Sequence, residues 1–221
     1  MSKIVIIGDS HSQLFDNNIN IGRGSWISNI SEYFDIRWLG PKTMWRLCRD
    51  KEDFINFKND IFYNPHPLYK SSTKCDLSDD IIISLGEIDI RCNIYKVNVN
   101  YVNVIDNMIN ELSIFIDNNI DYKLHFISIP PPIKESECIS KNSDFPFLGS
   151  DEIRKDMTIY FNEKIKELSL SKDKGYIDIY SLYNDDGYLD IYKSDKIVHC
   201  TKNIEFENYI KNYFKINENI K

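Results

Sequence analysis

The sequence predicts one α/β domain with a mostly parallel sheet of five strands and helices on both of its faces. Short apolar runs alternate along the chain with longer segments in which apolar residues recur every three or four positions. Strands that alternate with helices in this way form parallel sheets covered on both faces. No internal repeat, low-complexity linker or change in composition divides the chain, so residues 1–221 are expected to form a single domain.

The expected strands are short, apolar and bounded by turn residues. The first run, Ile-Val-Ile-Ile, ends at Gly8, and the third, which contains three consecutive isoleucines, ends at Gly86. Continuous apolar runs of this kind suit strands that are buried on both faces. The five strands are expected over residues 4–7, 35–39, 80–85, 124–129 and 176–180.

Helices are expected where apolar residues follow a helical period. The clearest lies between the third and fourth strands, with apolar residues at positions 102, 105, 108, 109, 112, 115 and 116. The other helices are expected over residues 25–34, 43–58, 151–170 and 204–214. Polar segments that contain proline are expected to form loops over residues 59–75 and 135–149.

Composition and charge limit the partners that the chain can bind. The formal net charge is −7 and 42% of the residues are hydrophobic, which is ordinary for a globular domain. Nucleic acids and anionic membrane surfaces are bound by clustered Lys and Arg, so we expect neither as a partner. No apolar run approaches the ~20 residues that span a bilayer. The apolar run after Lys3 is too short for a signal peptide, and we therefore expect a cytoplasmic protein.

Cysteine and histidine spacing gives no sign of a metal site. The five cysteines include no Cys-x-x-Cys pair, so we expect free thiols rather than a disulfide framework or a zinc site. His66 and His125 have no ligand-like spacing, and His125 lies inside an expected strand. No metal and no other cofactor is expected.

Polar residues and glycines gather directly after the expected strands, where open parallel sheets bind their ligands. Four such blocks are present: Gly8-Asp9-Ser10-His11-Ser12 after the first strand, Gly40-Pro41 after the second, Gly86-Glu87-Ile88-Asp89-Ile90-Arg91 after the third and Pro130-Pro131-Pro132 after the fourth.

These blocks resemble those of the SGNH (GDSL-like) hydrolases. Gly8-Asp9-Ser10 resembles the nucleophile block, and Gly40 stands where that family keeps its oxyanion glycine. Residues 86–89 stand where the family keeps its Gly-x-Asn-Asp block, and residues 195–199 where it keeps its Asp-x-x-His block. The order and separations match along nearly the whole chain. The resemblance implies the SGNH hydrolase fold, a three-layer flavodoxin-like sandwich.

A more particular resemblance comes from the extended motifs Gly-Asp-Ser-His-Ser and Gly-Glu-Ile-Asp-x-Arg. These are similar to a subgroup of SGNH-like proteins associated with glycan and polysaccharide biosynthesis. That similarity implies an acyl group on a sugar, often an acetyl group, as the reacting part of the substrate.

The resemblance assigns the residues of a catalytic triad. Ser10 is the implied nucleophile, His199 its base and Asp195 the carboxylate that orients the base. These residue types suit the chemistry, because a serine hydroxyl is a weak nucleophile until an imidazole takes its proton. The backbone N–H groups of Ser10 and Gly40 are the expected donors to the oxyanion.

Two positions depart from the family pattern. Ile88 stands where the family has its oxyanion asparagine, and isoleucine has no side-chain donor. Arg91 is close enough in sequence to supply a guanidinium donor instead. The acid and base are spaced Asp-x-x-x-His, so Lys196 occupies the usual acid position; we assign the acid to Asp195, with Asp190 as the alternative.

Each assignment has a structural alternative. Ser10 can be a simple turn residue. His199 can be a helix-capping or core histidine, and Asp195 a solvated loop acid. The other candidate roles concern the substrate: Glu87 and Asp89 can bind sugar hydroxyls or pair with Arg91, and His11 can contact substrate or be a bystander.

The function expected from the sequence is therefore a serine-dependent hydrolase or transferase of acyl groups, with an acyl-Ser10 intermediate. Its partners would be a small molecule or glycan that carries an acyl ester and, for transfer, an acyl donor. The alternative is a glycan- or partner-binding domain that keeps the fold without catalysis, because a fold does not by itself determine a function.

Overall fold

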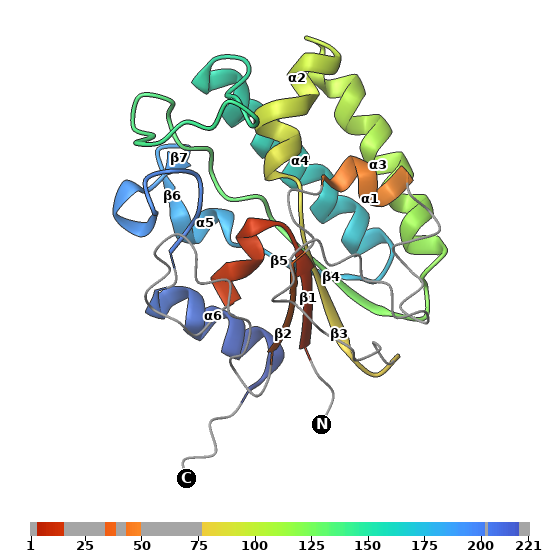
Figure 1. The fold of residues 1–221 in the computed structure, drawn as a ribbon. Helices are drawn as coiled ribbons and strands as arrows, with labels where there is room; N and C mark the ends of the chain where they lie inside the picture. The colour runs from red at the N-terminus through yellow and green to blue at the C-terminus, as the bar shows by residue number, and fades with distance from the viewer. Residues whose placement is uncertain (1–3, 16–33, 39–42, 50–76, 202, 217–221) are drawn as a thin grey trace.

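The computed structural model describes residues 4–15, 34–38, 43–49, 77–201 and 203–216. Its centre is a five-stranded parallel sheet in the order β2-β1-β3-β4-β5 (Figure 1). The strands are β1 (Ile4–Gly8), β2 (Phe34–Trp38), β3 (Asp80–Ser84), β4 (Lys123–Ile127) and β5 (Gly175–Ile177). The expected parallel five-stranded sheet is confirmed.

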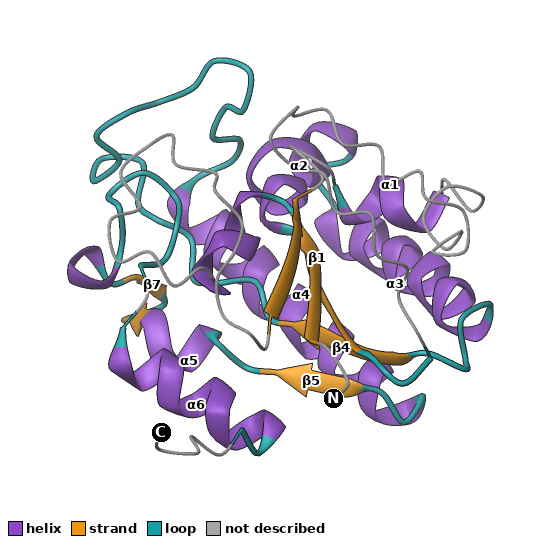
Figure 2. Cartoon of the chain, turned by 60° about the horizontal axis from the view of Figure 1, so that its bottom comes forward, coloured by secondary structure: helices purple, strands orange, loops and turns teal. Residues whose placement is uncertain are grey.

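The two faces of the sheet are covered by different helices, so the molecule has three layers. One face packs against α1 (Met44–Arg49), α3 (Tyr101–Asp117) and α4 (Asp151–Ser171). The other packs against a short 3₁₀ helix (Ser10–Phe15), α5 (Tyr180–Tyr183) and α6 (Ile204–Phe214). Figure 2 shows α3 and α6 on opposite sides of the sheet.

The apolar runs produce this sandwich because successive side chains of a strand point to opposite faces. Ile7 and Ile83 belong to the core under α3 and α4, whereas Ile6 and Ile82 belong to the core under α6. All four side chains are fully buried. A strand that is covered on both faces therefore reads as a continuous apolar run.

The long helices follow the expected periodicity and are capped at their starts. The Ser150 side chain accepts a hydrogen bond from the Ile153 amide at the start of α4, and Asn203 accepts one from the Phe206 amide at the start of α6. Such caps satisfy amides that have no partner within the helix. α6 has the expected bounds, and α4 ends one residue later than expected.

The last strand of the sheet is shorter than expected. It ends at Ile177, and Tyr180 begins α5 instead of ending the strand. The amides that follow the strand donate to side-chain oxygens instead of to a neighbouring strand. The Ile179 amide donates to Ser128 Oγ (2.8 Å) and the Tyr180 amide to Asp178 Oδ1 (3.0 Å). Asp178 thus competes with strand pairing, as Asp commonly does.

Several short elements were not expected. After β3 come a π-helix (Asp89–Asn93) and α2 (Ile94–Val97), and after α5 comes an antiparallel hairpin of β6 (Asn184–Asp185) and β7 (Tyr188–Leu189). A 3₁₀ turn (Ile191–Lys193) follows the hairpin. These elements span too few residues for a periodic pattern to be visible in the sequence.

Other expectations are met in part or lie outside the described residues. The helix expected over 43–58 is described only as α1, and the loop over 59–75 lies outside the described residues. The helix expected over 25–34 also lies outside them, apart from Phe34, which begins β2. Residues 135–149 form a loop, as expected.

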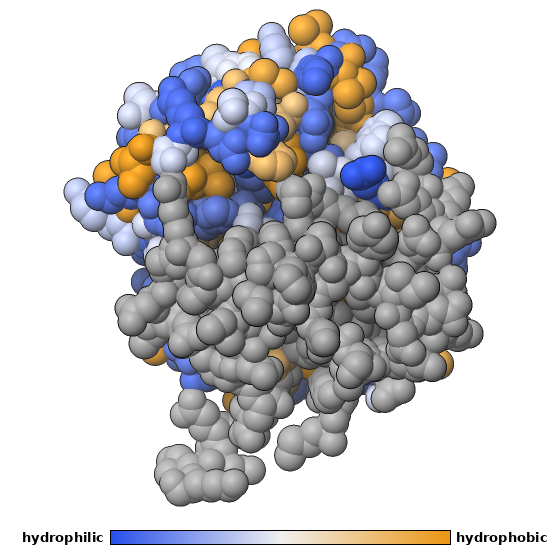
Figure 3. Space-filling model, viewed as in Figure 1, coloured by the Kyte–Doolittle hydropathy of each residue, from blue (hydrophilic) through white to orange (hydrophobic). Residues whose placement is uncertain are grey.

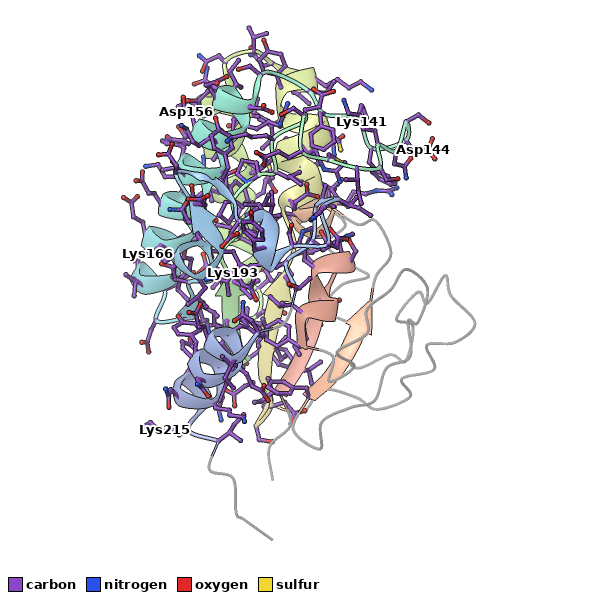
Figure 4. All side chains as sticks on the ribbon, turned by 90° about the vertical axis from the view of Figure 1, so that its left-hand side faces the viewer. Lys141, Asp144, Asp156, Lys166, Lys193 and Lys215 are labelled. Carbon is purple, nitrogen blue, oxygen red and sulfur yellow. The ribbon has the colours of Figure 1, made fainter. Side chains whose placement is uncertain are left out.

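The surface of the molecule is mixed in character where it is described. Figure 3 shows hydrophilic residues interspersed with apolar ones over the upper part of this face. Lys141 and Asp144 lie on the outer side of the loop 135–149 (Figure 4). No helix of the described residues is long and apolar enough to cross a membrane.

The strand order creates the place where a ligand can bind. In an order of 2-1-3-4-5 the chain leaves β1 in one direction and β3 in the other, and a crevice opens between their carboxyl ends. β1 and β3 are in close contact there: a Cβ on Gly8 would lie 2.3 Å from the Ser84 carbonyl oxygen. Glycine is therefore required directly before the segment that carries Ser10.

Candidate active site

Ser10, His199 and Asp195 form a continuous hydrogen-bonded chain beyond the carboxyl end of β1. Ser10 Oγ lies 2.8 Å from His199 Nε2, and His199 Nδ1 lies 2.7 Å from Asp195 Oδ2. Nδ1 donates to the carboxylate, which leaves Nε2 free to accept the Ser10 proton. Two segments that are far apart in the sequence thus meet in the geometry of a nucleophile, a base and an orienting acid.

Asp195 is held by the turn that it caps. Its Oδ1 accepts hydrogen bonds from the amides of Ile197 (2.7 Å), Val198 (3.1 Å) and His199 (3.1 Å), while Oδ2 faces the His199 ring. Burial alone would raise the pKa of Asp195, but the His199 ring and the amides outweigh it and lower the pKa to about 2. Asp195 is therefore ionised over the whole physiological range.

The unusual Asp-x-x-x-His spacing has a local structural basis. Ser194 and Cys200 form an isolated β-bridge, and the Asp195 amide donates to the His199 carbonyl (3.0 Å). Lys196 adopts a φ of 59°, in the left-handed region that tight turns use. The extra residue closes this turn and lets one carboxylate contact both the turn amides and the ring.

The alternative acid, Asp190, has a different place. Its side chain accepts from the Tyr192 amide (2.9 Å) and caps the 3₁₀ turn Ile191–Lys193. The carboxylate that contacts the His199 ring is that of Asp195.

Ser10 is placed by the tight turn that leaves β1. The Asp9 amide donates to the Ser84 carbonyl (3.2 Å), and Ser12 Oγ donates to the Asp9 carbonyl (2.6 Å). Ser10 is the first residue of the 3₁₀ helix Ser10–Phe15, and the first N–H groups of a helix have no partner inside it. Its amide remains the candidate oxyanion donor.

The other expected oxyanion donors are differently placed. Gly40 lies outside the described residues. Ile88 is 6% exposed and offers only an apolar side chain.

Arg91 has the partners that its alternative role as a loop brace requires. Its Nε lies 2.5 Å from Glu87 Oε1, its Nη2 lies 3.1 Å from Glu87 Oε2, and its Nη1 donates to the Phe145 carbonyl. The guanidinium also lies 5.5 Å from the centre of the Phe147 ring. All three guanidinium nitrogens are thus engaged, and the structure does not support the expected oxyanion contact of Arg91.

Glu87 is a buried carboxylate whose negative charge is stabilised by Arg91. Burial would raise the pKa of Glu87, but the charge and hydrogen bonds of Arg91 lower it. Burial likewise opposes the charge of Arg91, while Glu87 raises the pKa of Arg91. The charges of His11 and His199 also lower the pKa of Glu87. The expected role of Glu87 in binding sugar hydroxyls stays a prediction.

Asp89 is not placed to bind a substrate. It is 1% exposed, and its Oδ2 accepts from the Met44 amide (2.7 Å) at the start of α1. Burial, together with the charges of Asp9 and Glu87, raises the pKa of Asp89 to about 7 against the opposing effect of the Met44 and Trp45 amides. The expected contact of Asp89 with sugar hydroxyls is corrected to a helix cap.

His11 is also engaged by the protein. Its Nδ1 lies 3.2 Å from Asp9 Oδ1 and its Nε2 lies 3.1 Å from the Val198 carbonyl oxygen. The residue is 9% exposed, and its ring centre lies 5.0 Å from that of His199. Neither ring nitrogen is free for a substrate, so the expected substrate contact of His11 is not supported.

A narrow cavity adjoins the turn that carries His199. It is lined by Val198, the neighbour of His199, and by residues that follow β3 and β4, including Glu87, Arg91 and Pro130-Pro131-Pro132. Phe147, from the loop 135–149, completes one wall. The position of the prolines after a strand was visible in the sequence, but no sequence signal pointed to Phe147.

No cluster of three or more His, Cys, Asp or Glu side chains that could hold a metal ion is present in the described part of the chain. Cys48, Cys92, Cys138 and Cys200 are free thiols and buried. Cys75 and His66 lie outside the described residues.

Comparisons with known proteins give a likeness in structure only. No family model and no curated protein matches the sequence. A GDSL-like lipase from Bacteroides thetaiotaomicron matches with a TM-score of 0.56 and 13% identity, over 97% of this chain and 86% of that one. The lipase/acylhydrolase from Enterococcus faecalis matches with a TM-score of 0.52 and 15% identity, over 97% and 96% of the two chains.

A third solved structure agrees with these two. The aryl esterase of M. smegmatis matches with a TM-score of 0.53 and 12% identity, over 97% of this chain and 99% of that one. Each of the three matches covers 97% of this chain. The chain therefore has the fold of the GDSL-like (SGNH) hydrolases.

Proposed function

We propose that this protein is a serine-dependent acyl ester hydrolase or acyltransferase that acts through an acyl-Ser10 intermediate. The observation that carries the proposal is the hydrogen-bonded chain from Ser10 through His199 to Asp195. The fold is shared with esterases and acylhydrolases, which adds support.

The geometry suits acylation of Ser10. As Ser10 Oγ attacks the ester carbonyl, its proton passes to His199 Nε2, and Asp195 stabilises the imidazolium that forms. Negative charge develops on the carbonyl oxygen, which the Ser10 amide can stabilise. His199 then gives the proton to the departing alkoxide, and the acyl group remains on Ser10.

The second half of the reaction regenerates Ser10. His199 takes a proton from the acceptor, whose oxygen attacks the acyl carbonyl, and returns it to Ser10 Oγ as the ester bond breaks. Water as the acceptor gives hydrolysis, and a sugar hydroxyl gives transfer. Both reactions use the same groups.

The proposed acyl group is acetyl and the proposed carrier is a carbohydrate. Support for this part comes from the similarity of the Gly-Asp-Ser-His-Ser and Gly-Glu-Ile-Asp-x-Arg motifs to glycan-associated proteins.

A second candidate is a glycan- or partner-binding domain without catalysis. The buried Ile88 favours it, because removal of one oxyanion donor typically costs a hundred- to a thousand-fold in rate. A domain that only binds, however, has no need of the complete Ser10–His199–Asp195 arrangement.

Labelling with a fluorophosphonate probe separates the two candidates. The wild-type protein is expected to be labelled at Ser10, as read by mass spectrometry, and to hydrolyse p-nitrophenyl acetate. His199→Ala should lose labelling and Ser10→Ala should lose both. A wild-type protein that is neither labelled nor active on acetyl esters, including acetylated sugars, would favour the binding domain.

A further inference from the structure

His11 joins the segment of the nucleophile to the segment of the base. It follows Ser10 directly, and its ring spans from Asp9 at the end of β1 to the carbonyl of Val198, which precedes His199. The backbone amide of His11 also donates to Asp9 Oδ1 (2.8 Å). This one side chain therefore connects the turn after β1 with the turn 195–199.

The hydrogen-bond partners indicate the charge of the His11 ring. Asp9 Oδ1 already accepts the His11 amide, and the Val198 oxygen is a backbone carbonyl, so both partners of the ring are acceptors. A neutral imidazole has one donor and one acceptor nitrogen and can satisfy only one of them. The doubly protonated imidazolium satisfies both.

The surroundings of Asp9 agree with a cationic ring. Asp9 is 1% exposed, and its Oδ2 has no hydrogen-bond partner among the described residues. A buried carboxyl group in this situation needs a compensating positive charge. Burial alone would lower the pKa of His11, but the charge and hydrogen bond of Asp9, with Glu87 and the Val198 carbonyl, raise it to about 9.

We propose that His11 is a positioning residue of this site: its imidazolium fixes the turn that carries His199 and holds a permanent positive charge beside the catalytic base. The proposal rests on the proposed function of the Ser10–His199–Asp195 triad. His11 does not contact the reacting atoms, because both ring nitrogens are used by Asp9 and Val198.

The mechanical part of the role concerns the distance between Ser10 and His199. Asp195 braces the turn 195–199 from inside, and Lys196 is held from the other side by the Ile139 amide, which donates to its carbonyl (2.9 Å). Among the hydrogen bonds of the described residues, the His11 contact ties the turn to the segment that presents Ser10 in addition to the Ser10–His199 hydrogen bond itself. Its loss should loosen the Ser10–His199 contact and lower kcat, while KM stays the same.

The electrostatic part concerns the protonation of the base. His199 can take the Ser10 proton only while its ring is neutral. The described groups that face it are Ser10, Asp195, His11 and Glu87. The two carboxylates favour the protonated ring, whereas the His11 imidazolium, 5.0 Å away, disfavours it. The His11 imidazolium thus opposes a second positive charge on the neighbouring ring.

The test compares pH–rate profiles of the wild type and His11→Gln, using acetyl ester hydrolysis. Glutamine is neutral and keeps one N–H donor. We expect kcat to fall about ten-fold at neutral pH with KM unchanged, as small displacements of catalytic groups do. We also expect the acidic limb of kcat/KM to move to higher pH by about one unit, the effect of a charge at this distance in a partly hydrated site.

His125→Gln is the matched control. His125 is also a partly buried histidine, bonded to the Asp80 carboxylate (2.9 Å) and to the Tyr213 hydroxyl (2.9 Å), but it lies on β4. Its variant should lose stability without moving the acidic limb. An unmoved limb in His11→Gln, or an equal movement in His125→Gln, would overturn the electrostatic role, and an unchanged kcat would overturn the mechanical one.

An NMR titration of the wild-type protein tests the charge of His11 directly. It requires neither a folded variant nor enzymatic activity. The chain has four histidines, so the ring signals can be assigned. His11 is expected to remain an imidazolium from about pH 5 to pH 8. A ring that is neutral at pH 7 overturns this inference. If the wild-type protein is not labelled at Ser10 by fluorophosphonate, the proposed function is wrong, but the inference that His11 is charged is unaffected.

Discussion

The buried ion pair of His11 and Asp9 predicts a pH dependence of stability that can be measured without any substrate. Folding raises the pKa of His11 from 6.5 to about 9. A raised pKa in the folded state means that the group stabilises the fold fully below the unfolded pKa, and that this stabilisation is lost as the pH rises through the folded pKa. The contribution of His11 is therefore complete below pH 6.5 and gone above about pH 9.

The size of the effect follows from the same two pKa values. They differ by about 2.5, and each pKa unit corresponds to about 1.4 kcal/mol, so His11 contributes about 3 kcal/mol at low pH. Little of this is lost to solvent screening, because the residue is 9% exposed. For a domain whose free energy of unfolding is about 5–15 kcal/mol, this is a large fraction.

Urea unfolding of the wild type and His11→Gln near pH 6 and near pH 9.5, followed by circular dichroism, measures the effect. The variant should be less stable near pH 6, and its deficit should shrink by about 3 kcal/mol near pH 9.5. Groups that are remote from His11 titrate equally in both proteins, so they cancel in the difference. A deficit of the same size at both pH values would refute the argument that His11 is charged in the folded protein.

His125→Gln gives a control of opposite sign. Burial lowers the pKa of His125 more than the hydrogen bond and charge of Asp80 raise it. Protonation of the unfolded chain therefore destabilises the fold below pH 6.5, and the contribution of His125 to stability grows as the pH rises toward that value. The deficit of this variant should increase with pH, where that of His11→Gln decreases.

Three further predictions concern the carboxylates and Arg91. Asp195→Asn should lower kcat on an acetyl ester about 10⁴-fold with the fold intact by circular dichroism, because an amide does not hold the required tautomer of His199; a loss below about ten-fold would count against the triad. Arg91→Ala should destabilise the protein by about 3 kcal/mol in urea unfolding because it leaves Glu87 buried without its partner, whereas Arg91→Lys should keep turnover within a few-fold of wild type. A ten-fold loss of turnover in Arg91→Lys with unchanged stability would instead restore its role as an oxyanion donor. Asp89→Asn removes a carboxyl whose pKa is raised to about 7, so its stability relative to wild type should rise between about pH 4 and pH 7; a flat difference would contradict the burial argument.

Much of the fold could be predicted because burial on both faces leaves a direct mark on the sequence. The apolar run that forms β3 and the periodic apolar residues of α3 could be recognised without knowing which elements pack against them. The end of β5 was not, because the oxygens of Ser128 and Asp178 compete there with strand pairing. Ser128 lies on a different segment, so the sequence near β5 carries no sign of it.

The candidate site divides in the same way. The sequence by itself determined which residues follow each strand, and the local pattern around Ser10 and around Asp195 and His199 sufficed to select them. Only the tertiary structure decided what the remaining charged residues do. Arg91 pairs with Glu87 one helical turn away but also with the Phe145 carbonyl, 54 residues on, and His11 contacts the Val198 carbonyl, 187 residues on. Backbone carbonyls are present at every position, so no residue type marks them in advance. A charged side chain that uses them acquires its role only when the chain has folded around it.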